Sequence, residues 1–178
     1  MGETMKLAVA THVDLPAVVD LMNAGFRGTG SQASWNTEAG YIDGDRTSVT
    51  LLRDEIAAKP DARLLVGRSE HDGAIVASVW LEPAREGVWY LGSLTVAPRL
   101  QNAGEGRRLL EAAEHQARAW GATTIRMKVV NVRDTLIAWY VRRGYALTGE
   151  VEAFPYDDHR FGIPRRDDLT FVVLAKTL

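Results

Sequence analysis

The feature that most constrains this chain is a glycine-containing loop between a strand-like run and the strongest helical run of the sequence. Residues 88–96 are rich in apolar and β-branched side chains, and residues 104–120 repeat apolar side chains at helical spacing. Between them stands the pattern Gln-x-x-Gly-x-Gly, from Gln101 to Gly106. Glycine lets backbone N–H groups approach a ligand closely, and N–H groups at a helix N-terminus favour an anion. The loop is therefore a candidate site for a phosphate or pyrophosphate group.

Two basic residues, Arg107 and Arg108, follow this loop in the first turn of the predicted helix. Cations oppose the helix dipole there, so an anionic ligand accounts for them better than helix stability does. A P-loop requires Gly-Lys-Ser or Gly-Lys-Thr, and the dinucleotide fingerprint requires glycine where this chain has Leu109. Taken alone, the pattern leaves open a tight turn without a ligand and a loop that binds ATP.

The composition limits the kinds of protein and of site. A chain of 178 residues suits one domain, which we place over residues 1–178. The formal net charge of -2 argues against a dedicated nucleic-acid binder. No apolar run approaches the ~20 residues that span a bilayer, and we expect a cytoplasmic protein. The chain has no cysteine, which excludes disulfides, thiolate metal ligands and a cysteine acyl-enzyme. Its 4 histidines show no metal-ligand spacing, so we expect no metal.

Periodicity and turn residues predict a succession of strands and helices. The expected strands cover residues 6–10, 63–68, 74–82, 88–96, 124–130, 145–153 and 169–177. The expected helices follow Thr11 and cover residues 47–59, 104–120 and 134–143. Thr11 and Asp14 form a capping-box pattern for the first helix, whose apolar face we assign to Val13, Ala17, Leu21 and Ala24. A strand–helix–strand unit in the middle implies one parallel pair in an otherwise antiparallel sheet, hence an α/β protein of the α+β type.

Two long segments without periodicity are candidates for binding loops. Residues 27–46 are rich in glycine, serine and threonine, yet they include Trp35 and Tyr41. Residues 154–168 join the last two strands and mix Tyr156 with acids and bases. We assign these three aromatic residues to an acceptor site. A disordered surface loop is the alternative for the first segment.

A second motif lies 39 residues after Gln101, where the predicted helix over residues 134–143 ends. There the chain reads Trp139-Tyr140-Val141-Arg142-Arg143-Gly144-Tyr145. Together the two motifs resemble the GNAT superfamily of N-acetyltransferases. The loop is similar to its glutamine-or-arginine, x, x, glycine, x, glycine pattern, and the helix end is similar to its tyrosine, two or three residues, glycine, aromatic pattern. The expected order of elements also resembles that fold almost from Met1 to Leu178.

The resemblance implies a mixed, mostly antiparallel central sheet with helices on both faces. It implies that the strand over residues 89–96 splays away from the strand over residues 124–130 to admit the pantetheine arm of acetyl-CoA. The residues that it assigns to acetyl-CoA are Leu94, Val96, Gln101, Asn102, Ala103, Gly104, Glu105, Gly106 and Arg107. Tyr140 would lie near the thioester sulfur, where a phenol with a pKa of about 10 can protonate a leaving thiolate. A half-buried aromatic residue that only packs is the alternative for Tyr140.

Three features depart from the family pattern. An asparagine often stands seven residues before the tyrosine, where this chain has Arg133, and Asn131 lies nine before it. The strand over residues 89–96 carries no carboxylate that could act as a general base. Glu82 and Glu86 stand at neighbouring strand ends, and we interpret both as solvated surface acids. The general base therefore stays unassigned.

These observations predict an acetyl-CoA-dependent N-acetyltransferase that moves an acetyl group, by direct attack, to a primary amine of a small molecule or peptide. A catalytically silent acyl-CoA-binding or regulatory module is the first alternative, and an ATP-binding protein is the second. We expect no nucleic-acid or membrane partner. The oligomeric state stays open, with a homodimer among the options.

Overall fold

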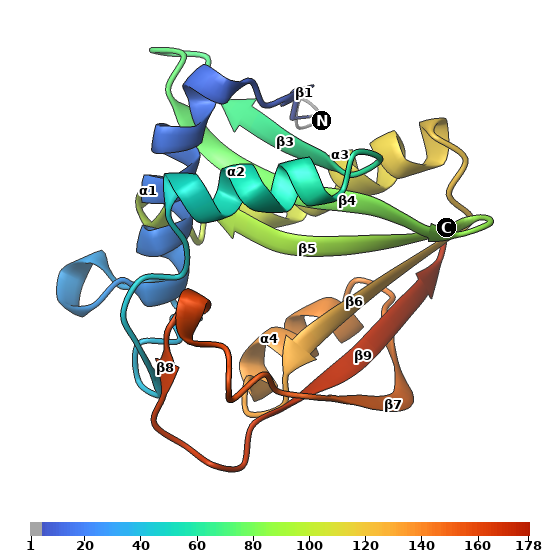
Figure 1. The fold of residues 1–178 in the computed structure, drawn as a ribbon. Helices are drawn as coiled ribbons and strands as arrows, with labels where there is room; N and C mark the ends of the chain where they lie inside the picture. Colours follow the sequence, from blue (N-terminus) through green and yellow to red (C-terminus); the bar gives the residue numbers. More distant parts are fainter. Residues whose placement is uncertain (1–4) are drawn as a thin grey trace.

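The computed structural model describes residues 5–178, which are organised around one large twisted sheet (Figure 1). Its strand order is β1-β3-β4-β5-β6-β9-β7. The strands are β1 Leu7–Val9, β3 Arg63–Arg68, β4 Ile75–Arg85, β5 Val88–Val96, β6 Thr124–Val130, β7 Ala146–Ala153 and β9 Thr170–Thr177. Neighbouring strands are antiparallel except for β5 and β6, which run parallel. This mostly antiparallel sheet with a parallel pair confirms the predicted fold class.

Helices cover both faces of the sheet, as the family resemblance implied. The α-helices are α1 Leu15–Arg27, α2 Val49–Ala58, α3 Glu105–Ala119 and α4 Asp134–Val141, and the 3₁₀ turns are η1 His12–Asp14, η2 Gly30–Gln32, η3 Pro98–Leu100 and η4 His159–Phe161. In Figure 1, α1 and α2 lie in front of β4 and β5, and α3 lies behind them. Leu64 and Trp80 pack in the cluster with α1 and α2, whereas Leu65 and Val79 pack in the cluster with α3. Because successive strand residues point to opposite faces, the sheet carries a core on each side.

The first helix begins later than the sequence suggested and buries a different face. The capping box is present, because the Thr11 N–H donates to Asp14 Oδ2 at 2.8 Å. Residues His12–Asp14 form the turn η1, so the helix begins at Leu15. Its buried face consists of Leu15, Val18, Val19, Leu21, Met22 and Gly25. Val13 is 72% exposed. The predicted apolar face is therefore wrong apart from Leu21.

The parallel strands β5 and β6 pair over only part of their length. Their ladder begins at Val88 with Thr124 and ends at Tyr90 with Arg126, although both strands continue. Ser93 of β5 has a φ of 50°, and the register between β4 and β5 shifts beside it, which marks a bulge that bends the strand. Figure 1 shows β5 and β6 diverging along their length. The predicted splay is confirmed, and it leaves one edge of β5 open over residues 91–96.

A second, two-stranded sheet joins the two long loops, and no sequence pattern predicted it. Strand β2, Ile42–Asp43, pairs antiparallel with β8, Ile163–Pro164. Next to this sheet the Arg165 N–H donates to the carbonyl of Tyr41 at 2.8 Å. Strands of two residues are too short to show periodicity, which is why they escaped sequence analysis. The two loops therefore form one unit beside the splayed strands, which we term the cap (residues 28–46 and 154–165).

Candidate active site

A cavity of about 780 Å³ connects the glycine loop, the gap between β5 and β6, and the cap. Its wall includes Gln101, Gly104 and Gly106 of the loop before α3. It also includes Tyr140 of α4 and Phe161 of the cap. The two motifs that the sequence brought to attention thus open onto the same space.

The glycine loop holds the N-terminus of α3 open toward this space. Gly104 is the N-cap in the left-handed conformation, with a φ of 79°, and the Arg108 N–H donates to its carbonyl at 3.1 Å. The earlier N–H groups of a helix have no intrahelical acceptor, and they suit an anion. Apart from Gly104 itself and the backbone next to it, no described atom lies within 4 Å of the place where a Cβ on Gly104 would stand. The loop therefore has both N–H donors and free space for a bulky anion.

Most of the residues assigned to acetyl-CoA from the sequence line the cavity. They are Leu94, Val96, Gln101, Asn102, Gly104, Gly106 and Arg107. The side chains of Ala103 and Glu105 do not belong to its wall, since Glu105 Oε1 instead accepts from Arg108 Nη1 at 2.8 Å. These two residues can contribute only their backbone groups.

A basic rim surrounds the same end of the cavity, formed by Arg107, Arg142 and Arg143. The guanidinium carbon of Arg143 lies 3.8 Å from the centre of the Trp139 ring, and its buried Nε has no hydrogen-bond partner within residues 5–178. Burial and the charges of Arg142 and Arg107 lower the pKa of Arg143. A buried, unpaired donor among like charges is a position where an anionic ligand would be stabilised. Of these arginines, sequence reasoning had assigned only Arg107 to the site.

Tyr140 lies buried in the cavity wall at the C-terminal end of α4. Its ring packs edge-on against Trp139 and Tyr145, with ring centres 5.1 Å and 5.7 Å apart. Among the described residues its hydroxyl has no hydrogen-bond partner, and burial raises the pKa of the phenol well above its usual value of 10.0. The hydroxyl is therefore protonated at neutral pH and is available as a donor to a group in the cavity.

The aromatic residues that we assigned to the acceptor site do not lie together. Trp35 lines the cavity, but its N–H donates to Gln101 Oε1 at 3.1 Å, which places it against the glycine loop. Tyr41 and Tyr156 lie outside the wall, and the Tyr156 hydroxyl accepts from the Leu169 N–H at 2.8 Å. The aromatic side chains that do line the cap end are Phe26, Phe154, Phe161 and Phe171. Phe26 lies on α1, Phe171 lies on β9, and Phe154 and Phe161 belong to the cap, so only the tertiary structure brings the four rings together.

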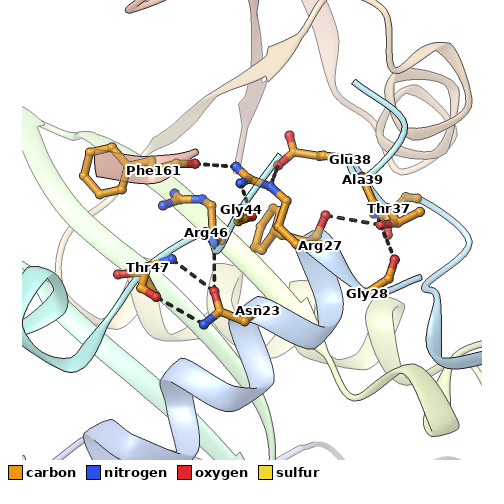
Figure 2. A network of polar contacts seen from close by, with 12 residues as sticks. Asn23, Arg27, Gly28, Thr37, Glu38, Ala39, Gly44, Arg46, Thr47 and Phe161 are labelled. Atoms are coloured by element: carbon orange, nitrogen blue, oxygen red, sulfur yellow. Dashed lines mark hydrogen bonds and ion pairs between the residues drawn. The ribbon is translucent and has the colours of Figure 1, made fainter. Parts of the chain in front are cut away.

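A buried ionic network fixes the cap to the body of the protein (Figure 2). Glu38 Oε1 pairs with Arg27 Nε, and Glu38 Oε2 pairs with Arg133 Nη1, both at 3.4 Å. The side chains of Arg27, Glu38 and Arg133 are 7%, 7% and 9% exposed. Arg133 also donates to the carbonyl of Asn36 at 2.7 Å. The arginine that departs from the family pattern thus has a partner in the cap.

The carboxylates near the cavity differ from the sequence interpretation in one case. Glu82 lines the wall with a side chain 22% exposed, and it accepts from Lys59 Nζ at 2.6 Å and from Trp80 Nε1 at 3.0 Å. Burial favours its protonated form, but these two donors outweigh burial and lower its pKa. Glu82 is therefore not the solvated surface acid that we expected, because β4 continues past it to Arg85. Glu86 is exposed, as predicted.

Asn131, the asparagine nine residues before Tyr140, follows β6 and binds the backbone at the start of β9. Its Oδ1 accepts from the Thr170 N–H at 3.0 Å, and its Nδ2 donates to the carbonyl of Asp168 at 3.0 Å. Both groups of the amide are therefore occupied by the backbone.

Comparison with known proteins assigns a family to this arrangement. The family model described as Acetyltransferase (GNAT) family matches residues 22–145, which include both the glycine loop and Tyr140. This chain belongs to the GNAT acetyltransferase family. The resemblance stated from the two motifs is confirmed.

Two curated relatives share part of this GNAT chain. An amino-acid acetyltransferase of Ralstonia nicotianae is 39% identical over 89 residues, which are 49% of this chain and 19% of the relative. An IAA acetyltransferase of Azospirillum brasilense is 34% identical over 100 residues, 56% of this chain and 64% of the relative. The chain thus spans about a fifth and just under two thirds of the lengths of these relatives.

Solved structures of GNAT proteins share the fold over nearly the whole chain. A PaiA N-acetyltransferase from Thermoplasma acidophilum in complex with coenzyme A has a TM-score of 0.69 and 16% identity, covering 99% of this chain and 100% of that one. A ribosomal-protein-alanine N-acetyltransferase from Brucella melitensis has a TM-score of 0.69 and 19% identity, covering 98% and 100%. At such identities the likeness shows the fold alone.

Within residues 5–178 of this GNAT chain, no group of three or more His, Cys, Asp or Glu side chains is placed to hold a metal ion. The same part of the chain contains no helix with the length and apolar character needed to cross a membrane.

Proposed function

We propose that the protein is an acetyl-CoA-dependent N-acetyltransferase that acts on a primary amine. The observation that carries this proposal is the single cavity that leads from the glycine loop, along the open edge of β5, to the hydroxyl of Tyr140. An elongated donor with a pyrophosphate, an amide-rich arm and a thioester matches the order of these features. The comparisons support the family, and the donor and acceptor are our inference from the site.

The donor end of the cavity fits coenzyme A. The N–H groups at the start of α3 and the buried Nε of Arg143 are donors that suit its phosphates. The edge of β5 that β6 leaves open over residues 91–96 suits the amides of the pantetheine arm, which would pair with β5 as an added strand does. Leu94 and Val96, which line this stretch, would contact the arm.

The chemistry requires a neutral amine on the cap side of the gap between β5 and β6. Its nitrogen attacks the thioester carbonyl carbon, the carbon–sulfur bond breaks, and the new amide loses its extra proton to water in the cavity. The thiolate takes a proton from the Tyr140 hydroxyl, which burial keeps protonated, and the resulting phenolate recovers a proton from the water that accepted the amine's proton. No acyl-enzyme is needed, which agrees with a chain that has no cysteine.

The experiment is a release assay for free coenzyme A thiol with acetyl-CoA and a panel of amines, which include amino acids, peptides, polyamines and aminoglycosides. Because the chain has no cysteine, it contributes no thiol background. Saturable thiol release with an acetylated amine in the mass spectrum supports the proposal. Tight acetyl-CoA binding without turnover on any amine would instead show a silent binding module, and displacement of bound acetyl-CoA by ATP would indicate a nucleotide site.

A further inference from the structure

We propose that Arg46 binds a carboxylate of the acceptor, so that the acceptor is a small α-amino acid rather than a simple amine. This inference rests on the proposed function and names the substrate class of the same site.

Arg46 stands where the reaction would take place. It lines the cavity, and its Nη2 donates to the hydroxyl of Ser93 at 3.4 Å. Ser93 is the bulged residue at which β5 bends away from β6. The guanidinium therefore lies on the cap side of the gap between β5 and β6, next to the edge of β5 along which acetyl-CoA would lie.

The guanidinium of Arg46 is held in place without using most of its donors. Its central carbon lies 5.4 Å from the ring centre of Phe26 and 5.2 Å from that of Phe161, so an aromatic ring of α1 and one of the cap hold it. The Arg46 N–H donates to Asn23 Oδ1 at 2.8 Å, which fixes the backbone, and Figure 2 shows the side chain beside Phe161. A guanidinium has five N–H donors in a fixed plane, and within residues 5–178 this one makes a single, long hydrogen bond.

No carboxylate of the described residues contacts Arg46, although the charge of Glu55 acts on it from α2. Within residues 5–178 no carboxylate forms an ion pair with Arg46, whereas Arg27 and Arg133 share the single carboxylate of Glu38. Burial is the main cause that lowers the pKa of Arg27; the charge of Glu38 opposes it, and the positive charge of Arg46 adds to the lowering. Glu55 faces Arg46 from α2 but forms no ion pair with it. The wall carries an excess of positive charge that a carboxylate from a ligand would neutralise.

The position of Arg46 also limits where the carboxylate stands in the acceptor. Because the guanidinium lies beside Ser93, a carboxylate bound to it is close to the thioester. The attacking amine must therefore lie within a few bonds of that carboxylate. This arrangement fits an α-amino acid, in which one carbon separates the two groups.

The test compares each standard α-amino acid with its α-amide, which has the same side chain and the same reacting group but no carboxylate charge. kcat/KM is measured for both members of each pair with the wild type, Arg46→Met, Arg46→Lys and a control, Arg53→Met. Met keeps an apolar stem between the phenylalanine rings, and Arg53 is an exposed arginine of α2 outside the cavity wall. The ratio of kcat/KM for the amino acid to kcat/KM for its amide is compared between variants. This comparison cancels any difference in the basicity of the two amines.

We expect the wild type to favour the amino acid of its best pair, and Arg46→Met to reduce this preference about 10- to 100-fold, as for a lost hydrogen-bonded charge pair. Arg46→Lys should retain part of it, and Arg53→Met all of it. An equal loss on acid and amide in Arg46→Met would show a merely structural role and overturn the inference. Activity on other amines but on no amino acid would also overturn it and leave the proposed function standing, whereas no transfer to any amine would overturn both.

Discussion

Arg27 donates from Nη2 to the carbonyl oxygen of Phe161 at 2.6 Å, a hydrogen bond between residues 134 positions apart. The same guanidinium donates from Nη1 to the carbonyl of Gly44 at 2.9 Å. One side chain at the end of α1 thus holds both loops of the cap. Glu38 pairs with both this arginine and Arg133, so the placement of the cap depends on one buried carboxylate.

We expect Glu38→Gln to destabilise the protein strongly, because it leaves two buried guanidinium groups without a counter-ion. Loss of one member of a buried ion pair costs about 3–5 kcal/mol of the free energy of unfolding. The measurement is urea unfolding followed by circular dichroism. Asp43→Asn is the control, since it removes the exposed pair with Arg165 in the same cap and should cost at most about 1 kcal/mol. Equal costs for the two variants would contradict the importance of the buried pair.

Tyr140→Phe should reduce kcat while acetyl-CoA affinity and the melting temperature stay close to those of the wild type. The substitution removes the hydroxyl and leaves the ring contacts with Trp139 and Tyr145 in place. General acid help is worth about 10²–10⁴-fold, and a thiolate is a good leaving group, so we expect the low end of that range. A fully active, stable variant would leave Tyr140 with a packing role.

Gly104→Val should weaken acetyl-CoA binding more than about tenfold, measured by calorimetry. Valine does not readily adopt the φ of 79° at this N-cap, at a cost of about 1–2 kcal/mol, and its side chain would enter the space beside the loop amides. Gly73→Val is the matched control, because Gly73 has a φ of 72° and an equally open surrounding in the turn before β4. It should lower stability by a similar amount without affecting acetyl-CoA. Unchanged affinity in a folded Gly104 variant would place the pyrophosphate elsewhere.

Trp35→Ala should raise the KM for acetyl-CoA at least as much as the KM for the acceptor. The sequence suggested an acceptor-side residue, but the Trp35 backbone is bonded to the Gln101 side chain of the glycine loop. Initial-rate kinetics with each substrate varied in turn separates the two constants. Trp120→Ala serves as the control, since Trp120 is also partly exposed and stacks on Trp89 outside the cavity. A rise in the KM for the acceptor alone would support the assignment of Trp35 to the acceptor site.

Glu55→Gln should stabilise the protein at neutral pH. Burial is the main cause that raises the pKa of Glu55, and the charge of Arg46 only partly opposes it. A carboxyl whose pKa is raised in the folded protein binds protons more tightly in the folded state than in the unfolded state. Its contribution to the free energy of unfolding is therefore favourable at low pH and is lost as the pH rises through the folded pKa. The melting temperature of the variant should exceed that of the wild type at pH 7, and the difference should shrink below about pH 4.3, the ordinary pKa of glutamate. A constant difference across this range would show that Glu55 is not desolvated.

The sequence determined the elements that local periodicity controls and the motif that local geometry controls. The strands over residues 88–96 and 124–130 appear with the predicted bounds, because runs of apolar and β-branched residues between turn signals specify strands locally. Gly104 was identifiable as a special position, because a glycine before a strong helix is the residue that tolerates a left-handed N-cap. The family followed from the spacing of that loop and Tyr140.

The tertiary structure alone decided which distant residues meet. Glu38 gives no sequence signal that it will lie between Arg27 and Arg133, 11 and 95 residues away, because ion pairing across a fold leaves no local pattern. The cap depends on strands of two residues, whose pairing is set by the packing of the loops around them rather than by their own periodicity. For the same reason the predicted acceptor aromatics Tyr41 and Tyr156 lie outside the cavity wall. Arg46 lines the cavity only once α1, the cap and the bulge at Ser93 are assembled.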